Sequence, residues 1–93
     1  MTAKTWFITG ASSGFGRAFA DYALAQGHNV VATARRTAPL DELAAQAPDR
    51  VLVLSLDVTV PAEAERAVAA AKQRFGRLDV VINNAGLDRK SVV

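Results

Sequence analysis

The chain has 93 residues, of which 51% are hydrophobic and 22% charged, a composition typical of one soluble domain that is small for an α/β enzyme. Its net charge of +2 comes from basic residues spread along the sequence without a basic run, and it has no cysteine, so nucleic-acid binding, disulfides and thiol chemistry are not expected. No apolar run reaches the ~20 residues of a membrane span or has the form of a signal peptide, so we expect a cytoplasmic protein without a membrane partner.

Strand and helix signals alternate from the amino terminus. Residues 4–9 are rich in aromatic and β-branched side chains and predict a buried strand that ends at Gly10. Residues 14–26 predict a helix that ends at Gly27. The inner face predicted for this helix combines aromatic and small residues at helical spacing: Phe15, Phe19 and Ala23, with Gly16 and Ala20 beside them.

The same alternation continues through the middle of the chain. Residues 29–34 predict a second strand, and the nearly continuous apolar run 51–56 predicts a third strand that is covered on both faces. Between them a short helix is expected, with Pro39 near its start and Pro48 after its end. The apolar positions of that helix are Leu40, Leu43, Ala44 and Ala47.

A third helix and a fourth strand complete the pattern. The helix is expected from about residue 61 to residue 75, where Gly76 ends it, and the strand covers residues 78–82. The apolar face of the helix consists of Ala64, Val68, Ala71 and Phe75.

This alternation predicts the fold. Strands joined by helices over short connections form right-handed βαβ units, so we expect an α/β fold with a doubly wound, Rossmann-type parallel sheet, truncated at four strands in the order 3-2-1-4. In that order ligands bind at the carboxyl ends of the first and fourth strands, where the direction of winding reverses. The domain is predicted to span residues 1–86, followed by a tail at 87–93.

A glycine-rich turn lies between the first strand and the first helix. Glycine allows a sharp turn and lets a bulky ligand approach the backbone, and the free N–H groups at the following helix terminus favour a pyrophosphate. Residues 9–16 therefore predict a phosphate-binding loop, although strand-to-helix turns also use glycine for purely structural reasons. The turn at residues 83–86 leaves the fourth strand, so the two segments are expected to face each other across the crevice.

These residues resemble the short-chain dehydrogenase/reductase family over residues 4–86. The resemblance rests on residues 9–16 with the spacing Gly-x-x-x-Gly-x-Gly, on Asp57 just after the third strand, and on Asn83-Asn84-Ala85-Gly86. It implies the amino-terminal half of an NAD(P)-dependent oxidoreductase that acts on an alcohol or a ketone. The cofactor-binding residues that it implies are Gly10, Ser12, Ser13, Gly14, Phe15 and Gly16 at the pyrophosphate and ribose, Asp57 and Val58 at the adenine, and Asn83, Ala85 and Gly86 near the riboses.

Two of these assignments have a structural alternative. Asp57 could instead cap the loop before the third helix. Asn83 and Asn84 could be turn formers that tie the fourth strand to its neighbours, and we expect this turn to have both roles at once.

Arg35 and Arg36 follow the second strand and indicate the cofactor. An NAD site would place a carboxylate here for the ribose hydroxyls, whereas guanidinium groups match a 2′-phosphate, so NADP is predicted in preference to NAD. The alternative is a solvated surface pair.

The sequence offers no catalytic or metal-ligating residue. The tyrosine, lysine and serine on which the family's chemistry depends lie beyond the matched segment, and Tyr22 has Gln26 rather than lysine four positions on. A truncation, a frameshifted end or a fragmentary record would each produce this. We therefore expect the 93 residues alone to be inactive, and a non-catalytic nucleotide-binding module and an inactive remnant remain alternatives.

Three further expectations concern packing. The only histidine, His28, is expected in an exposed turn, and Trp6 is expected to pack within the first strand. The fourth strand is predicted at the edge of the sheet with apolar residues on both faces, so self-association through residues 78–82 is expected.

Overall fold

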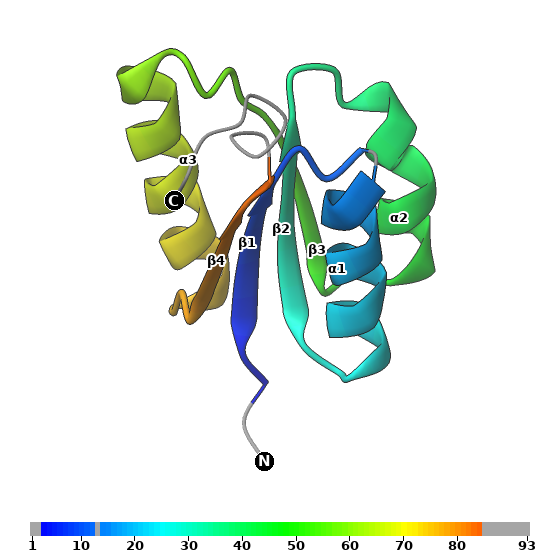
Figure 1. Cartoon of the computed structure of the whole chain (residues 1–93). Helices are drawn as coiled ribbons and strands as arrows, with labels where there is room; N and C mark the ends of the chain where they lie inside the picture. Colours follow the sequence, from blue (N-terminus) through cyan, green and yellow to red (C-terminus); the bar gives the residue numbers. More distant parts are fainter. Residues whose placement is uncertain (1–2, 13, 85–93) are drawn as a thin grey trace.

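In this computed structural model, which describes residues 3–12 and 14–84, the chain forms a parallel four-stranded sheet with helices on both faces (Figure 1). The elements in chain order are β1 (Thr5–Thr9), α1 (Gly14–Ala25), β2 (Asn29–Ala34), a 3-10 turn η1 (Ala38–Leu40), α2 (Asp41–Gln46), β3 (Val51–Ser55), α3 (Pro61–Phe75) and β4 (Val80–Asn83). The strand order β3-β2-β1-β4 confirms the predicted fold class and topology. Ser13, Ala85, Gly86 and the tail at 87–93 lie outside the described residues.

Two apolar cores sandwich the sheet, one on each face. Helices α1 and α2 lie on one side and α3 on the other, as Figure 1 shows with the sheet seen nearly edge-on. The larger core, under α1 and α2, includes Ile8, Ala20, Ala23, Val30, Ala32, Leu40 and Leu43. The smaller core, under α3, consists of Phe7, Val31, Leu56, Ala67 and Ala71. Because β1 and β2 contribute to both cores, they form the rigid centre from which the loops at their carboxyl ends project.

The predicted inner face of α1 was wrong in its aromatic residues. The buried residues of α1 are Gly16, Ala20, Ala23 and Leu24. Phe15 is 72% exposed and Phe19 36% exposed, so both rings lie mainly on the outside. The physical reason is the close approach of α1 to the loop after β1, where the helix has room only for small side chains.

The helix ends agree with the sequence. Gly27 and Gly76 have φ values of 85° and 78°, the left-handed conformation expected just after a helix. The second helix is shorter than predicted, because its first residues form the 3-10 turn η1.

The fourth strand begins two residues later than predicted. The carboxylate of Asp79 accepts a hydrogen bond from the Thr5 backbone N–H at 2.8 Å, and thus takes the donor that a longer strand would use. Regular pairing with β1 starts at Val80, opposite Trp6.

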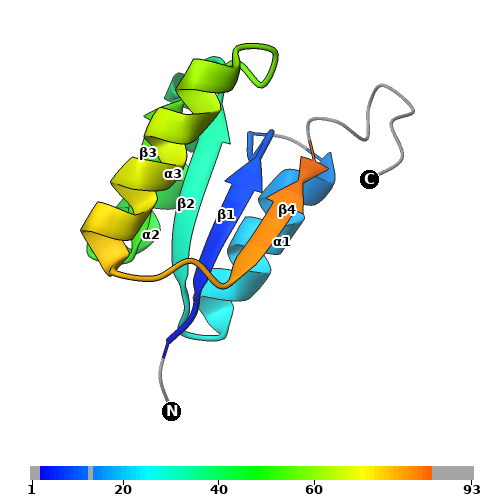
Figure 2. The ribbon, with the colours of Figure 1, turned by 90° about the vertical axis from the view of Figure 1, so that its left-hand side faces the viewer.

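The two edge strands of the sheet, β3 and β4, pair with no further strand among the described residues. Figure 2 shows α3 lying over β2 and β3 while β4 stands clear of it. Val81 points to this uncovered side and is 61% exposed. At the other edge, β3 packs against both cores, as predicted, with Val53 on the larger core and Leu52 and Leu54 on the smaller one. This cover is partial, since Val51 is the only fully buried residue of β3.

Trp6, Tyr22 and His28 cluster at the amino end of β1. His28 is half-buried rather than exposed, since its ring stacks on Trp6 at 6.2 Å and its Nδ1 accepts a hydrogen bond from the Lys4 N–H. Trp6 also contacts Tyr22 of α1, with ring centroids 6.0 Å apart.

Among the described helices, none is both long and apolar enough to cross a membrane.

Candidate functional site

The glycine loop between β1 and α1 depends on glycine at two positions for its backbone conformation. Gly10 and Gly14 have φ values of 62° and 58°, which residues with a Cβ adopt only at a cost. A Cβ added to Gly14 would meet no atom within 4 Å, so the space beside the first turn of α1 is open.

Gly16 has a different role, because it allows close packing. A Cβ at this position would lie 2.3 Å from the carbonyl oxygen of Gly10 and 2.9 Å from Nδ2 of Asn84. The first turn of α1 therefore lies directly against the loop backbone, which is possible only with glycine.

The loop is also tied to β2. The backbone N–H of Ala11 donates to the carbonyl of Thr33 at 3.0 Å. The Thr33 hydroxyl in turn donates to the carbonyl of Ile8 at 3.0 Å, and Thr33 is only 1% exposed. The sequence analysis missed Thr33; its signal was a single hydroxyl within an otherwise apolar, buried strand.

The turn after β4 meets the glycine loop, as predicted from the topology. Nδ2 of Asn84, whose residue is 5% exposed, donates to the carbonyl of Gly10 at 3.0 Å. The hydroxyl of Thr9 donates to Oδ1 of Asn83 at 3.1 Å. The two asparagines thus tie β4 to the end of β1, while the Asn83 residue stays exposed.

Asp57 holds the loop between β3 and α3. Its Oδ1 accepts hydrogen bonds from the N–H of Thr59 at 2.9 Å and from the Thr59 hydroxyl at 2.6 Å. Its own N–H donates to the carboxylate of Glu63 at 2.9 Å, a contact that the sequence analysis missed. The loop-capping alternative is therefore realised in the structure, and the neighbouring Val58 is 42% exposed at the same end of the sheet.

Arg35 and Arg36 directly follow β2 and are both exposed. Neither guanidinium forms an ion pair within the part of the chain that the structure describes. The carbonyl of Arg35 accepts a hydrogen bond from the Ser55 hydroxyl at 3.3 Å, which links the ends of β2 and β3.

The carboxyl ends of the four strands thus gather most of the predicted residues at one edge of the sheet. Ser12 is half-buried in the loop and Phe15 lies outside the core, while Ser13, Ala85 and Gly86 fall outside the described residues. Within residues 3–12 and 14–84 there is no group of three histidine, aspartate or glutamate side chains that could hold a metal ion. The arrangement offers backbone N–H groups, amides and cations, which suit an elongated anionic ligand.

Comparison with known proteins agrees with this geometry. A family model described as short chain dehydrogenase matches residues 4–93. The chain belongs to the short-chain dehydrogenase family. A solved short-chain dehydrogenase from Streptomyces avermitilis is 53% identical, with a TM-score of 0.87, over 91% of this chain and 31% of that one.

Named relatives cover the same region. Oxidoreductase BOA17 of Botryotinia fuckeliana (strain B05.10) is 45% identical over 91 residues, which is 97% of this chain and 33% of the relative. The NADP-dependent 3-hydroxy acid dehydrogenase YdfG of Escherichia coli (strain K12) is 38% identical over 80 residues, or 86% of this chain and 32% of the relative. The chain therefore spans about a third of the length of these relatives.

Proposed function

We propose that this chain is the NADP(H)-binding part of an oxidoreductase that transfers hydride between NADP(H) and an alcohol or ketone. The observation that carries the proposal is the contact of the asparagine turn with the glycine loop at the carboxyl ends of β4 and β1. Arg35 and Arg36 follow the neighbouring strand β2, exposed and without an ion pair to any described residue. The relative named as NADP-dependent supports the same assignment.

The residues present fit such a cofactor. The open space beside Gly14 suits the pyrophosphate, and so do the first N–H groups of α1, which as in any α-helix have no partner within the helix. The close packing at Gly16 holds the start of α1 in place. Asp57 and Val58 would lie at the adenine, and Asn83 would lie near the riboses. When bound, the nicotinamide ring would supply or accept the hydride; the residues of this chain bind it and orient it.

Arg35 and Arg36 supply the preference for a 2′-phosphate. A charge-assisted hydrogen bond contributes roughly 1.5–3 kcal/mol, which corresponds to about 10- to 150-fold in affinity at ~1.4 kcal/mol per decade. We therefore expect NADPH to bind at least tenfold more tightly than NADH.

Titration of the chain with NADPH and NADH, followed by the fluorescence of the reduced nicotinamide, tests this proposal. Arg36→Ala should reduce the affinity for NADPH and leave that for NADH unchanged. Lys72→Ala is the matched control, because it removes an exposed cation of α3 away from the crevice. Equal affinities for the two cofactors would refute the preference, and no binding of either would refute the nucleotide site itself.

We also propose that this chain binds NADPH without catalysing its oxidation. Tyr22, its only tyrosine, lies on the exposed side of α1 in contact with Trp6, away from the crevice. NADPH should therefore bind without being oxidised when a ketone is added, and steady oxidation would refute this part.

A further inference from the structure

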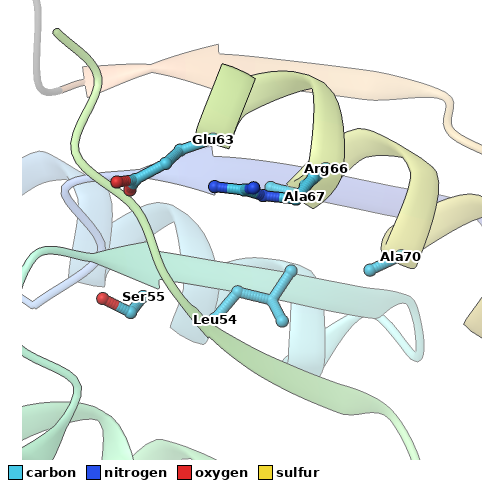
Figure 3. Close-up of a pocket in the computed structure, with 6 residues that line it drawn as sticks. All are labelled: Leu54, Ser55, Glu63, Arg66, Ala67 and Ala70. Atoms are coloured by element: carbon cyan, nitrogen blue, oxygen red, sulfur yellow. The ribbon is translucent and has the colours of Figure 1, made fainter. Parts of the chain in front are cut away.

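A hollow separates α3 from the edge strand β3, on the side of the molecule away from α1. It has a volume of about 440 Å³ and is lined by Leu54, Ser55, Glu63, Arg66, Ala67 and Ala70. Figure 3 shows Leu54 and Ser55 reaching it from β3, and Glu63, Arg66 and Ala70 from α3. Ala67 and Ala70 are too small to cover Leu54, which stays half-buried and is the largest apolar side chain in the wall of the hollow.

The strand beside this hollow presents an unpaired edge. Backbone groups of Arg50 and Leu56 bond to β2. Because successive residues of a strand alternate, the N–H and C=O groups of Val51, Val53 and Ser55 point away from β2. No described strand pairs with that edge, since β3 is the outermost strand of the sheet.

Two side chains of α3 mark the ends of the open edge. The carboxylate of Glu63 accepts a hydrogen bond at 2.9 Å from the backbone N–H of Asp57, which lies just after β3. Nη2 of Arg74 donates to the carbonyl of Asp49 at 2.8 Å, just before β3. Between these two contacts the outward backbone groups of the strand have no such partner within the part of the chain that the structure describes.

Arg66 supplies a charge at the side of the hollow. Its residue is exposed, and its guanidinium makes no ion pair with any described residue. The nearest carboxylate in the hollow, that of Glu63, is already held by the backbone of Asp57. An additional carboxylate beside Arg66 would therefore find a cation without a competing partner.

We propose that this groove, formed by the β3 edge and the α3 residues Arg66, Ala67 and Ala70, docks an extended acidic peptide segment of a partner protein. The segment adds a strand to β3, places an apolar side chain over Leu54 and pairs a carboxylate with Arg66. Main-chain hydrogen bonds then supply affinity, while the hollow and the cation select the side chains. The proposal does not depend on the nucleotide site.

A labelled octapeptide of alternating threonine and leucine, with one leucine replaced by glutamate, is the probe for fluorescence anisotropy with the full chain. Matched peptides carry lysine in place of the glutamate, or N-methyl groups on alternate backbone nitrogens. The glutamate peptide should bind, the lysine peptide should bind less tightly, and the N-methylated peptide should not bind. Amide hydrogen exchange should slow at Val53 and Ser55 when the glutamate peptide is bound.

Charge reversal distinguishes this groove from other surfaces. Arg66→Glu should lower the affinity for the glutamate peptide about fivefold, which is the upper range for an exposed ion pair. The same variant should raise the affinity for the lysine peptide. Lys72→Glu makes the same charge change elsewhere on α3 and should alter neither affinity. Absence of binding, equal responses of the two variants, or protection of β4 instead of β3 would overturn the proposal. Concentration-dependent protection of β3 without peptide would also overturn it, because a second copy of the chain would then occupy the groove.

Discussion

Replacing Gly16 by alanine tests how closely α1 lies against the loop after β1. At an exposed helix position alanine is more favourable than glycine by about 1 kcal/mol. Here the new Cβ would lie 2.3 Å from the carbonyl oxygen of Gly10 and 2.9 Å from Nδ2 of Asn84. The first of these atoms belongs to the backbone, so the helix or the loop would have to move.

The expected cost follows from these contacts. Overpacking a tight interior costs about 1–3 kcal/mol, and loss of the Asn84–Gly10 hydrogen bond costs about 0.5–1.5 kcal/mol. After the gain in helix propensity of about 1 kcal/mol is subtracted, we expect Gly16→Ala to lower the free energy of unfolding by about 2 kcal/mol.

Urea unfolding at low protein concentration, followed by the fluorescence of Trp6, measures this change, because Trp6 is the only tryptophan. Ala18→Gly is the matched control: Ala18 is exposed on α1, so the reverse exchange there reports helix propensity alone. A Gly16→Ala chain that is as stable as the unmodified chain, or more stable, would show that α1 does not approach the loop this closely.

Three further substitutions test other parts of the fold. Asn84→Ala removes the buried tie to the glycine loop and should cost about 1–2 kcal/mol in the same unfolding assay. The Arg77 guanidinium and the Thr5 N–H lower the pKa of Asp79. The contribution of this carboxylate to the stability of the fold is therefore present above the ordinary aspartate pKa and is lost as the pH falls through the lowered value. Asp79→Asn should remove this acid dependence below about pH 4, and unchanged acid sensitivity of the variant would contradict the assignment. Val81→Lys, at the open β4 margin, should shift sedimentation towards monomer if the chain self-associates through this edge, whereas an unaltered profile would place the contact elsewhere.

The features that the sequence predicted correctly depend on local signals. Alternating apolar runs and helix-ending glycines gave the strand order β3-β2-β1-β4 and the left-handed residues Gly27 and Gly76. The same order predicted that the glycine loop and the asparagine turn face each other across a crevice; in the structure Asn84 of the turn bonds to Gly10 of the loop, and the ligand-binding role of the two segments stays a prediction. These outcomes follow from backbone geometry, which a single sequence carries in its spacing.

The features that the sequence did not predict depend on contacts between distant segments. The aromatic and small stripes of α1 are adjacent on the helix, and the small stripe faces inward because Gly16 packs against the backbone of Gly10 and Ala20 and Ala23 pack into the core. Likewise the late start of β4 follows from a carboxylate of Asp79 that bonds across 74 positions to Thr5. The hydroxyl of Thr33 and the carboxylate of Glu63 act in the same way, through partners that periodicity does not reveal.

The glycine loop is held by hydrogen bonds between segments that are distant in the sequence. Ala11 bonds to Thr33, Thr33 bonds to Ile8, and Asn84 bonds to Gly10, so three adjacent strands of the sheet hold the loop. These hydrogen bonds fix the position of the loop that we propose to bind the pyrophosphate. This is the physical reason to expect nucleotide binding from the chain even where turnover is absent, and it makes cofactor titration the measurement most directly tied to the structure.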